Sequence, residues 1–384
     1  MKKRIALTLS HILVAALATV ITLSVTWQEP VTDSYTKLEQ LSDLIEQRFI
    51  GEVDVTAMED AAADAMIASL NDRWSYYIPA KEYASHVEQM NNAYVGIGIT
   101  ITVAEDESGF LVMVVNEGGP AEEAGLQVND VITAIEGTSC AGLNPSDGRN
   151  LVRGEEGTQV QITVVRDEQE QNFSITRRQV TVPVATWEML DGNVGLITIT
   201  NFDSRCAEET ISAIESLVDR GAQKLLFDVR NNPGGYADEL VKVLDYLLPE
   251  GEVFHTLDYT GKENFEYSDK KRLEIPMAVL VNRDSYSAAE FFAAALSEYE
   301  VATVVGEQTS GKGYFQYTFQ LNDGSAVGLS SGKYFTPKGQ SLEGVGITPD
   351  VEVPVDEETY LLIYYGQLEP REDPQIQAAL EVLK

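Results

Sequence analysis

Cysteine and histidine are scarce in this chain of 384 residues. It contains two cysteines, Cys140 and Cys206, and three histidines. Structural zinc sites use closely spaced sets of these residues, so we expect no metal, and nothing in the sequence indicates another cofactor. A disulfide framework is excluded as well. We expect no bridge between the two cysteines because they fall in different predicted domains.

Positive charge is also in short supply. The 27 lysine and arginine residues stand against 61 aspartate and glutamate residues, which gives a formal net charge of -34. Nucleic-acid phosphates repel such a chain, so we expect no nucleic-acid partner. The hydrophobic share of 44% is ordinary for a globular protein and excludes wholesale disorder. The length allows roughly two or three domains of ~150 residues each.

A single long apolar run extends from Ile5 to Trp27 and is long enough to cross a bilayer as a helix. Basic residues precede it and acidic residues follow it: Lys2, Lys3 and Arg4, then Glu29, Asp33 and Glu39. This polarity predicts that residues 1–27 form a single-pass anchor in the cell membrane and that residues 28–384 are extracytoplasmic. A cleaved signal peptide is the alternative, because Ala16-Leu17-Ala18 resembles a cleavage site. The run continues well beyond that site, which favours the anchor.

Residues 28–90 are predicted to be helical. Apolar residues recur there at helical spacing: Leu38, Leu41, Ile45 and Phe49. Helices this short bury little surface alone. We therefore expect them to pack on the body of the protein or on a second copy of the chain, as in a homodimer.

Residues 91–180 change to a strand pattern. Strands are predicted at Val95–Ile101, Phe110–Val115, Val131–Ile135 and Val160–Val165, with a short helix after Pro120. The order of these segments resembles a PDZ domain. That resemblance implies that a loop formed by Gly96, Ile97, Gly98 and Ile99 presents backbone N–H groups to the terminal carboxylate of a bound peptide. Taken alone, the two glycines also suit an ordinary β-bulge.

Residues 181–355 alternate between strands and helices, which predicts an α/β layered core. The expected strands are Val194–Ile199, Lys224–Val229, Met277–Val281 and Val301–Val305. The expected helices are Glu208–Val218, Glu239–Leu248 and Ala288–Tyr299. Residues 356–384 are expected to form a tail that ends in a helix over Pro374–Leu383. The whole chain is thus predicted to be a multidomain α/β protein.

Ser287 lies between a predicted strand and a predicted helix. With Glu290 three residues later it fits an ordinary capping box, which needs no catalytic role. A serine at this place also suits a nucleophile, since the unpaired N–H groups of a helix N-terminus can stabilise an oxyanion. The sequence alone leaves both interpretations open.

A nucleophilic serine needs a base, and no histidine is marked for that role. His255 lies in a strand-like segment and is the remaining candidate for a Ser-His-Asp site, because His11 lies in the apolar run and His86 in the helical region. A lysine can replace histidine where burial lowers its pKa. Lys312 follows an apolar strand and has a glycine on each side, although Gly-Lys-Gly also suits an exposed turn.

Together these motifs resemble the carboxyl-terminal processing peptidases, also called tail-specific proteases. The matching segments are Ser287-Ala288-Ala289-Glu290, Arg230 to Gly235, and Gly306-Glu307-x-Thr309-x-Gly311-Lys312-Gly313 with Gln316. The resemblance implies a Ser-Lys dyad, with Lys312 placed 25 residues after Ser287 and Gln316 orienting Lys312. It further implies an oxyanion hole at the backbone of Gly235 and Ala288, and an Arg153 that faces the catalytic body.

The resemblance also implies an endopeptidase that acts on proteins or peptides with accessible C-termini. Three positions depart from the family's usual residues: Arg73 stands in place of proline, Tyr286 of alanine and Ser310 of phenylalanine. Because two of them flank the expected catalytic residues, a catalytically inactive PDZ adaptor remains the alternative function.

Overall fold

The structure, a computed structural model, describes residues 36–90 and 93–384, which divide into two units at Met66. The first unit contains helix α2 (Thr36–Arg48) and most of helix α3 (Val55–Ala68). Apolar side chains of both helices line one shallow pocket, including Leu41 and Met58. The predicted helices are therefore confirmed. Their apolar residues remain largely uncovered, since no residue of α3 is buried, and pairing with a second copy stays a prediction.

The predicted membrane anchor at residues 1–27 lies outside the described residues. Within the described ranges, no helix is long and apolar enough to cross a membrane.

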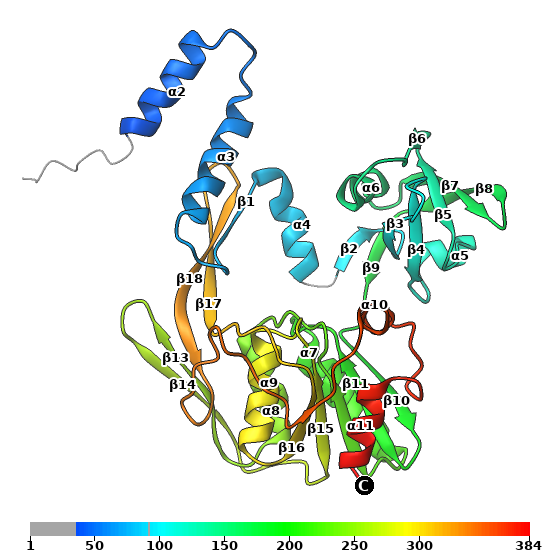
Figure 1. The fold of residues 1–384 in the computed structure, drawn as a ribbon, viewed down its shortest axis with the longest axis vertical. Coiled ribbons are helices and arrows are strands. Elements are labelled where there is room, and N and C mark those ends of the chain that lie inside the picture. The colour runs from blue at the N-terminus through cyan, green and yellow to red at the C-terminus, as the bar shows by residue number, and fades with distance from the viewer. Residues whose placement is uncertain (1–35, 91–92) are drawn as a thin grey trace, which may run out of the picture. The chain divides into compact units, whose positions relative to one another are not determined.

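One core of the second unit is built on a six-stranded sheet in the order β10-β11-β12-β15-β16-β19 (Figure 1). Its strands are β10 (Ala185–Leu190), β11 (Val194–Ile199), β12 (Lys224–Asp228), β15 (Met277–Val281), β16 (Ala302–Gly306) and β19 (Val351–Glu352). β10 runs antiparallel to β11, and the other neighbours are parallel. This arrangement confirms the predicted α/β core.

Helices cover both faces of this sheet because its strands are apolar on both sides. The helices are α7 (Cys206–Asp219), α8 (Ala237–Leu247), α9 (Ala288–Glu298) and α11 (Pro374–Val382). A further helix, α10 (Glu357–Tyr364), has no buried residue and precedes α11. Phe227 and Val279 face the core formed with α7, α8 and α9, whereas Leu226 and Leu280 face α11. Successive side chains of each strand point to opposite faces, so they pack against different helices.

A second, five-stranded sheet was not predicted from the sequence. It contains β1 (Tyr76–Ile78), β13 (Gly251–Asp258), β14 (Glu263–Ser268), β17 (Tyr314–Gln320) and β18 (Ala326–Phe335). β1 pairs with β18, so the segment that follows α3 is fastened to the body by backbone hydrogen bonds. A further helix, α4 (Ala80–Met90), comes directly after β1.

A separate apolar core holds the PDZ-like module. Its sheet has the order β3-β4-β5-β7-β8, with β6 beside β5. The strands are β3 (Ile99–Val103), β4 (Phe110–Val115), β5 (Val131–Ile135), β6 (Thr138–Ser139), β7 (Gln159–Arg166) and β8 (Gln169–Thr176). The helices are α5 (Pro120–Ala124) and α6 (Pro145–Val152). Phe110, Ile132 and Val164 are fully buried at its centre, and the module agrees with the predicted fold.

One predicted strand, Val95–Ile101, is in fact two. β2 (Ala93–Gly96) pairs with β9 (Arg178–Thr181), whereas β3 begins at Ile99 in the module's main sheet. The extended conformation is interrupted at Gly98, whose φ of 78° lies in the left-handed region that glycine adopts without strain. The two cysteines are both free thiols, as expected: Cys140 packs in the module and Cys206 in the sheet core.

Candidate active site

Three of the predicted site residues lie on loops at one edge of the six-stranded sheet. β12, β15 and β16 are parallel neighbours, so the loops that follow them leave the sheet on the same side. These loops carry, in turn, Gly235, Ser287 and Lys312. The order of the strands, rather than closeness in sequence, therefore brings the three residues to one edge.

Ser287 is the residue immediately before α9. Its backbone has φ 57° and ψ -125°, a conformation that non-glycine residues rarely adopt. Such strain is of the order of 1–3 kcal/mol and persists where the surroundings fix the chain. The Ser287 N–H donates to Glu290 Oε2 at 3.0 Å, and its carbonyl accepts from the Glu290 N–H at 2.9 Å.

The Arg230–Gly235 loop is bonded to the loop that carries Ser287. Asn231 and Asn282 pair through their side chains at 2.8 Å, and Tyr286 N–H donates to the Asn232 carbonyl at 3.1 Å. Asn232 is itself held in place, because its side-chain nitrogen Nδ2 donates to the Ile199 carbonyl at 2.7 Å. These hydrogen bonds hold the loop after β12 against the loop after β15.

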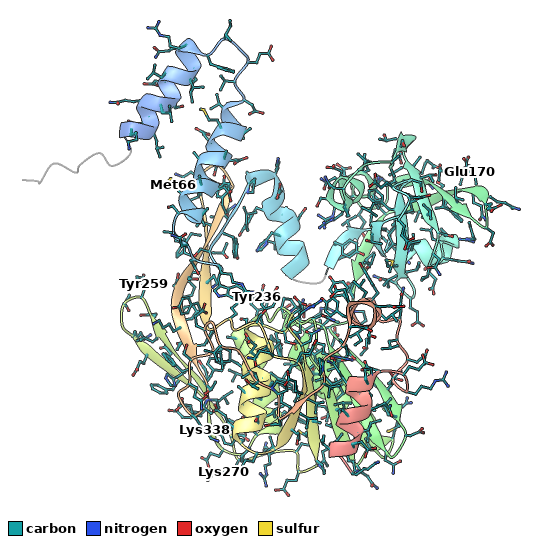
Figure 2. The ribbon with its side chains drawn as sticks, in the orientation of Figure 1. Met66, Glu170, Tyr236, Tyr259, Lys270 and Lys338 are labelled. Atoms are coloured by element: carbon teal, nitrogen blue, oxygen red, sulfur yellow. The ribbon has the colours of Figure 1, made fainter. Side chains whose placement is uncertain are left out.

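Glycine is required where this loop meets Ser287. A Cβ added to Gly234 would lie 2.7 Å from the Ser287 Cβ and 2.8 Å from the Ala288 nitrogen. A Cβ on Gly235 would lie 2.3 Å from the Phe202 carbonyl oxygen. Tyr236, labelled in Figure 2, follows directly and begins α8. The backbone at Gly234 thus approaches the start of α9 closely, and Gly235 lines a pocket together with Ser287 and Ala288. The oxyanion hole expected at Gly235 and Ala288 stays a prediction.

Glu290 connects the serine loop to the lysine loop. Its side chain is fully buried, and its two oxygens accept four hydrogen bonds. Oε1 accepts from Thr309 Oγ1 at 2.5 Å and from Gly311 N–H at 2.8 Å, while Oε2 accepts from Ser287 N–H at 3.0 Å and from Lys312 N–H at 2.8 Å. Burial raises the pKa of Glu290 above its ordinary value, and these donors oppose the rise.

The Lys312 side chain lies among aromatic rings. Its Nζ is 5.1 Å from the ring centroid of Trp74 and 5.7 Å from that of Tyr286. Burial lowers the pKa of Lys312 below its ordinary value, and the nearby carboxylates of Glu343, Glu290 and Asp72 oppose that shift. A lysine with a lowered pKa is available as a neutral base at a lower pH than an exposed one.

Gln316 makes other hydrogen bonds than the predicted one. Its Nε2 donates to the Tyr314 carbonyl and to Ser330 Oγ, both at 3.1 Å. The predicted orientation of Lys312 by this side chain stays a prediction.

A narrow apolar pocket opens beside Ser287, with about 220 Å³ of unfilled space that is continuous with solvent. Its lining comes from α8, α9 and the second sheet: Gly235, Ala237, Leu240, Phe254, Ser287, Ala288, Phe291 and Tyr334. A serine that lies beside an apolar pocket and close to the backbone of Gly234 is suited to acyl transfer from a peptide.

Sequence comparisons identify the family. A model of peptidase family S41 matches residues 193–353, and a PDZ-domain model matches residues 111–166. The carboxy-terminal processing protease CtpA of Bacillus subtilis is 31% identical over 365 residues, covering 92% of this chain and 78% of that protein. The chain belongs to peptidase family S41. A CtpA-like serine protease of Staphylococcus aureus (strain N315) is 33% identical over 321 residues, which cover 83% of this S41 chain but only 64% of the staphylococcal protein.

Solved structures give the same assignment for the S41 chain. The photosystem II D1 C-terminal processing protease matches with a TM-score of 0.50 and 27% identity, over 85% of this chain and 89% of that one. A Bacteroides fragilis protein described as an S41 protease matches with a TM-score of 0.56 over 76% of this chain and 82% of that one. At 19% identity the second match shows a shared fold alone.

His255 has partners of its own in the S41 chain. Its Nδ1 lies 2.6 Å from Glu252 Oε1, and its ring stacks between Phe265 and Phe335 at centroid distances of 4.9 and 4.8 Å. These contacts hold the ring in the second sheet. They give no support to a Ser-His-Asp site that uses His255.

The predicted peptide-binding loop lies in the PDZ module. The Ile97 carbonyl accepts from Ala121 N–H at 2.8 Å, and the Gly98 carbonyl accepts from Asn116 N–H at 3.0 Å. These bonds fix the loop just before β3. Arg153, at the C-terminal end of α6, donates to Ser85 Oγ of α4. The role predicted for Arg153 toward the catalytic body stays a prediction.

Three residues of the site were missed from the sequence. Trp74 lies in a segment that was noted only for its departure from the family pattern, and Glu290 was interpreted as a helix cap and a motif residue with no role toward Lys312. Glu343 carried no signal at all, although its carboxylate accepts from Trp74 Nε1–H at 3.1 Å and from Gly313 N–H at 2.8 Å. Contacts across more than 200 residues of chain leave no pattern in a single sequence.

Proposed function

We propose that this chain is a serine endopeptidase that cleaves proteins near their C-termini, with Ser287 as nucleophile and Lys312 as general base. One observation carries the proposal. A single carboxylate oxygen, Glu290 Oε2, accepts hydrogen bonds from the backbone N–H groups of both residues. The nucleophile and the base are therefore fixed to one buried group.

The reaction follows from the chemistry of the two side chains. Neutral Lys312 removes the proton from Ser287 Oγ as this oxygen attacks a peptide carbonyl. The N–H groups of Gly235 and Ala288 stabilise the oxyanion. The Lys312 ammonium then gives its proton to the departing amine, which leaves an acyl-enzyme. Water, deprotonated by Lys312, hydrolyses that ester and regenerates Ser287.

The pockets beside Ser287 support a polypeptide substrate. The narrow apolar pocket lies directly beside Ser287. It shares Ala237, Phe254 and Tyr334 with a wider groove of about 1600 Å³ between α8, β14 and β17. Aromatic side chains such as Phe265 and Tyr317 line this groove. An extended chain can lie across both features.

Recognition of substrate tails is assigned to the PDZ module. β3 is the terminal strand of its sheet, so one side of it is not paired within that sheet. Such an edge suits the addition of a peptide strand, and the Gly96–Ile99 loop at its start is placed to receive the terminal carboxylate. This assignment explains why a binding module and a protease core occur in one chain.

The location is inferred from the N-terminal sequence. Basic residues before the apolar run Ile5–Trp27 and acidic residues after it favour a membrane anchor with the catalytic part outside the cytoplasm. The uncovered apolar side chains of α2 and α3 favour pairing of two copies, since exposed apolar surface is stabilised by association.

The decisive experiment compares wild type, Ser287→Ala and Lys312→Ala on an unstructured protein such as casein. We expect both variants to lose at least ~10³-fold in rate while keeping the wild-type circular dichroism spectrum. Residual activity close to wild type in either folded variant rules out the dyad. A folded wild type that binds C-terminal peptides but cleaves none of them supports the adaptor alternative.

A further inference from the structure

Two aromatic rings lie next to the Lys312 ammonium. Trp74 comes from the segment before β1, and Tyr286 directly precedes Ser287. Their ring centroids are 5.9 Å apart with an interplanar angle of 28°. Lys312 Nζ lies within 6 Å of both centroids, at 5.1 and 5.7 Å, which is the range in which a cation is attracted to a ring.

Hydrogen bonds hold the Trp74 ring in this position. Trp74 Nε1–H donates to Glu343 Oε1 at 3.1 Å, and Glu343 Oε2 accepts from the N–H of Gly313, the residue after Lys312, at 2.8 Å. Arg73 lies over the Trp74 ring at 4.4 Å and donates to the Ser310 carbonyl at 3.4 Å. The tryptophan is thus connected to the chain on both sides of Lys312.

The charged groups around Lys312 come from several elements. Asp72 and Arg73 lie in the segment before β1, Glu290 in α9, and Glu343 in the loop after β18. The three carboxylates favour the ammonium form, whereas burial disfavours it. Tyr286 is itself half-buried, and burial raises the pKa of its phenol above the ordinary value.

We propose that Trp74 and Tyr286 form an aromatic clamp that binds the protonated side chain of Lys312 and so sets the pH at which this residue becomes a base. The proposal rests on the proposed role of Lys312 as the general base. The face of an aromatic ring attracts an ammonium but not a neutral amine. Loss of the proton therefore releases the side chain from the clamp, and release and activation occur together.

The residues that depart from the family pattern lie next to one another at the clamp. Arg73, Tyr286 and Ser310 are far apart in the sequence, yet Arg73 bonds to the Ser310 carbonyl and contacts the ring that stacks on Tyr286. The three departures thus meet around one lysine. Trp74 and Tyr286 are positioning residues, since they act on the reaction through Lys312.

The test separates the ring's electrostatic effect from its bulk. Tyr286→Leu keeps an apolar wall but removes the ring face, whereas Tyr286→Phe keeps the ring. We expect Tyr286→Leu to move the acidic limb of the kcat/KM profile down by about 0.5–1 pH unit, with a ~3–10-fold higher rate on that limb. Tyr286→Phe should leave the midpoint within ~0.2 unit of wild type, because a phenyl face binds a cation nearly as well.

A second readout does not depend on proteolysis. In a Ser287→Ala background, the labelling of Lys312 by acetic anhydride is followed against pH by mass spectrometry, with Tyr286 as Tyr, Phe, Leu or Met. The Leu and Met variants should titrate at lower pH than the Tyr and Phe variants. Equal midpoints in all four, or equal shifts for Phe and Leu, overturn the clamp. Full activity of Lys312→Ala overturns the proposed function instead, and leaves the labelling result to decide the clamp.

Discussion

The carboxylate of Glu290 joins the backbone of Ser287 to the backbone of Lys312, with Oε2 at 3.0 Å from the first nitrogen and 2.8 Å from the second. The side chain is fully buried, so no water can replace either bond. In Glu290→Gln, one of the two oxygens becomes an amide group that donates instead of accepting. We expect a loss of about 2–4 kcal/mol in unfolding free energy, together with a large fall in kcat.

The matched control is Glu298→Gln at the other end of the same helix. Glu298 also accepts two hydrogen bonds at 2.7 Å, from Thr336 Oγ1 and from Lys338 N–H, but these lie outside the site. Denaturant unfolding and casein cleavage are measured for both variants. Glu298→Gln should lose stability while its kcat stays near wild type. If Glu290→Gln keeps its kcat, the carboxylate does not position the dyad.

Gly234 supports Ser287 by having no side chain. In Gly234→Ala the new Cβ would lie 2.7 Å from the Ser287 Cβ, so one of the two backbone segments must move. Displacement of the order of an ångström at reacting groups lowers rates by about 10²-fold. We expect kcat to fall by that factor in an assay at saturating substrate.

Gly221→Ala separates this steric effect from backbone strain. Gly221 has a φ of 96°, close to the 89° of Gly234, but a Cβ there meets nothing within 4 Å. Both variants should lose about 1 kcal/mol of stability from the positive φ. Only Gly234→Ala should lose activity, and equal activities in the two variants would contradict the close approach to Ser287.

Local patterns in the sequence predicted many strands of the PDZ-like module and of the six-stranded sheet well. Phe110–Val115, Val131–Ile135, Val194–Ile199 and Met277–Val281 have the predicted ends. Their short length and their many β-branched residues are typical of buried strands. The second sheet was missed because β14 and β17 mix polar and aromatic residues, and because β1 gains its partner from β18, more than 200 residues away.

The site was predictable only in part. Ser287 and Lys312 were found through motif spacing, whereas the roles of Glu290 and Glu343 depend on which loops meet after folding. A buried carboxylate that accepts four hydrogen bonds and one that caps a helix have the same local sequence. Only the long-range contacts of the folded chain therefore distinguish these two roles of Glu290.

Arg230 is expected to hold the C-terminal helix on the sheet. Its side chain is buried and pairs with Asp228 at 2.6 Å and with Asp373, the N-cap of α11, at 2.8 Å. Arg230→Met leaves both carboxylates buried without their cation. We expect a loss of about 3–5 kcal/mol in unfolding free energy, with faster amide hydrogen exchange in α11.

Arg272→Met is the control for that variant. Arg272 pairs with Glu274 at 2.9 Å, but both side chains are exposed, at 41% and 71%. Exposed pairs contribute little because water screens them. Its unfolding midpoint and the exchange of α11 should match wild type, and a similar loss in both variants would contradict a special role for the buried pair.

Lys312 should make both activity and stability depend on pH. Burial lowers the pKa of Lys312 below the ordinary 10.5, and the carboxylates of Glu343, Glu290 and Asp72 limit the shift. Between the folded and unfolded pKa values the unfolded chain binds more protons, so stability rises with pH across that window. Lys312→Met removes this contribution. Measured by urea unfolding, the stability of wild type relative to Lys312→Met should therefore increase as pH rises through the window toward 10.5. The cleavage rate of wild type should rise at the lower end of that window, because it follows the pKa of Lys312 in the folded chain. A stability difference that does not change with pH would show that the Lys312 pKa is the same in the folded and unfolded chains, and a base with an ordinary lysine pKa would be almost fully protonated at neutral pH.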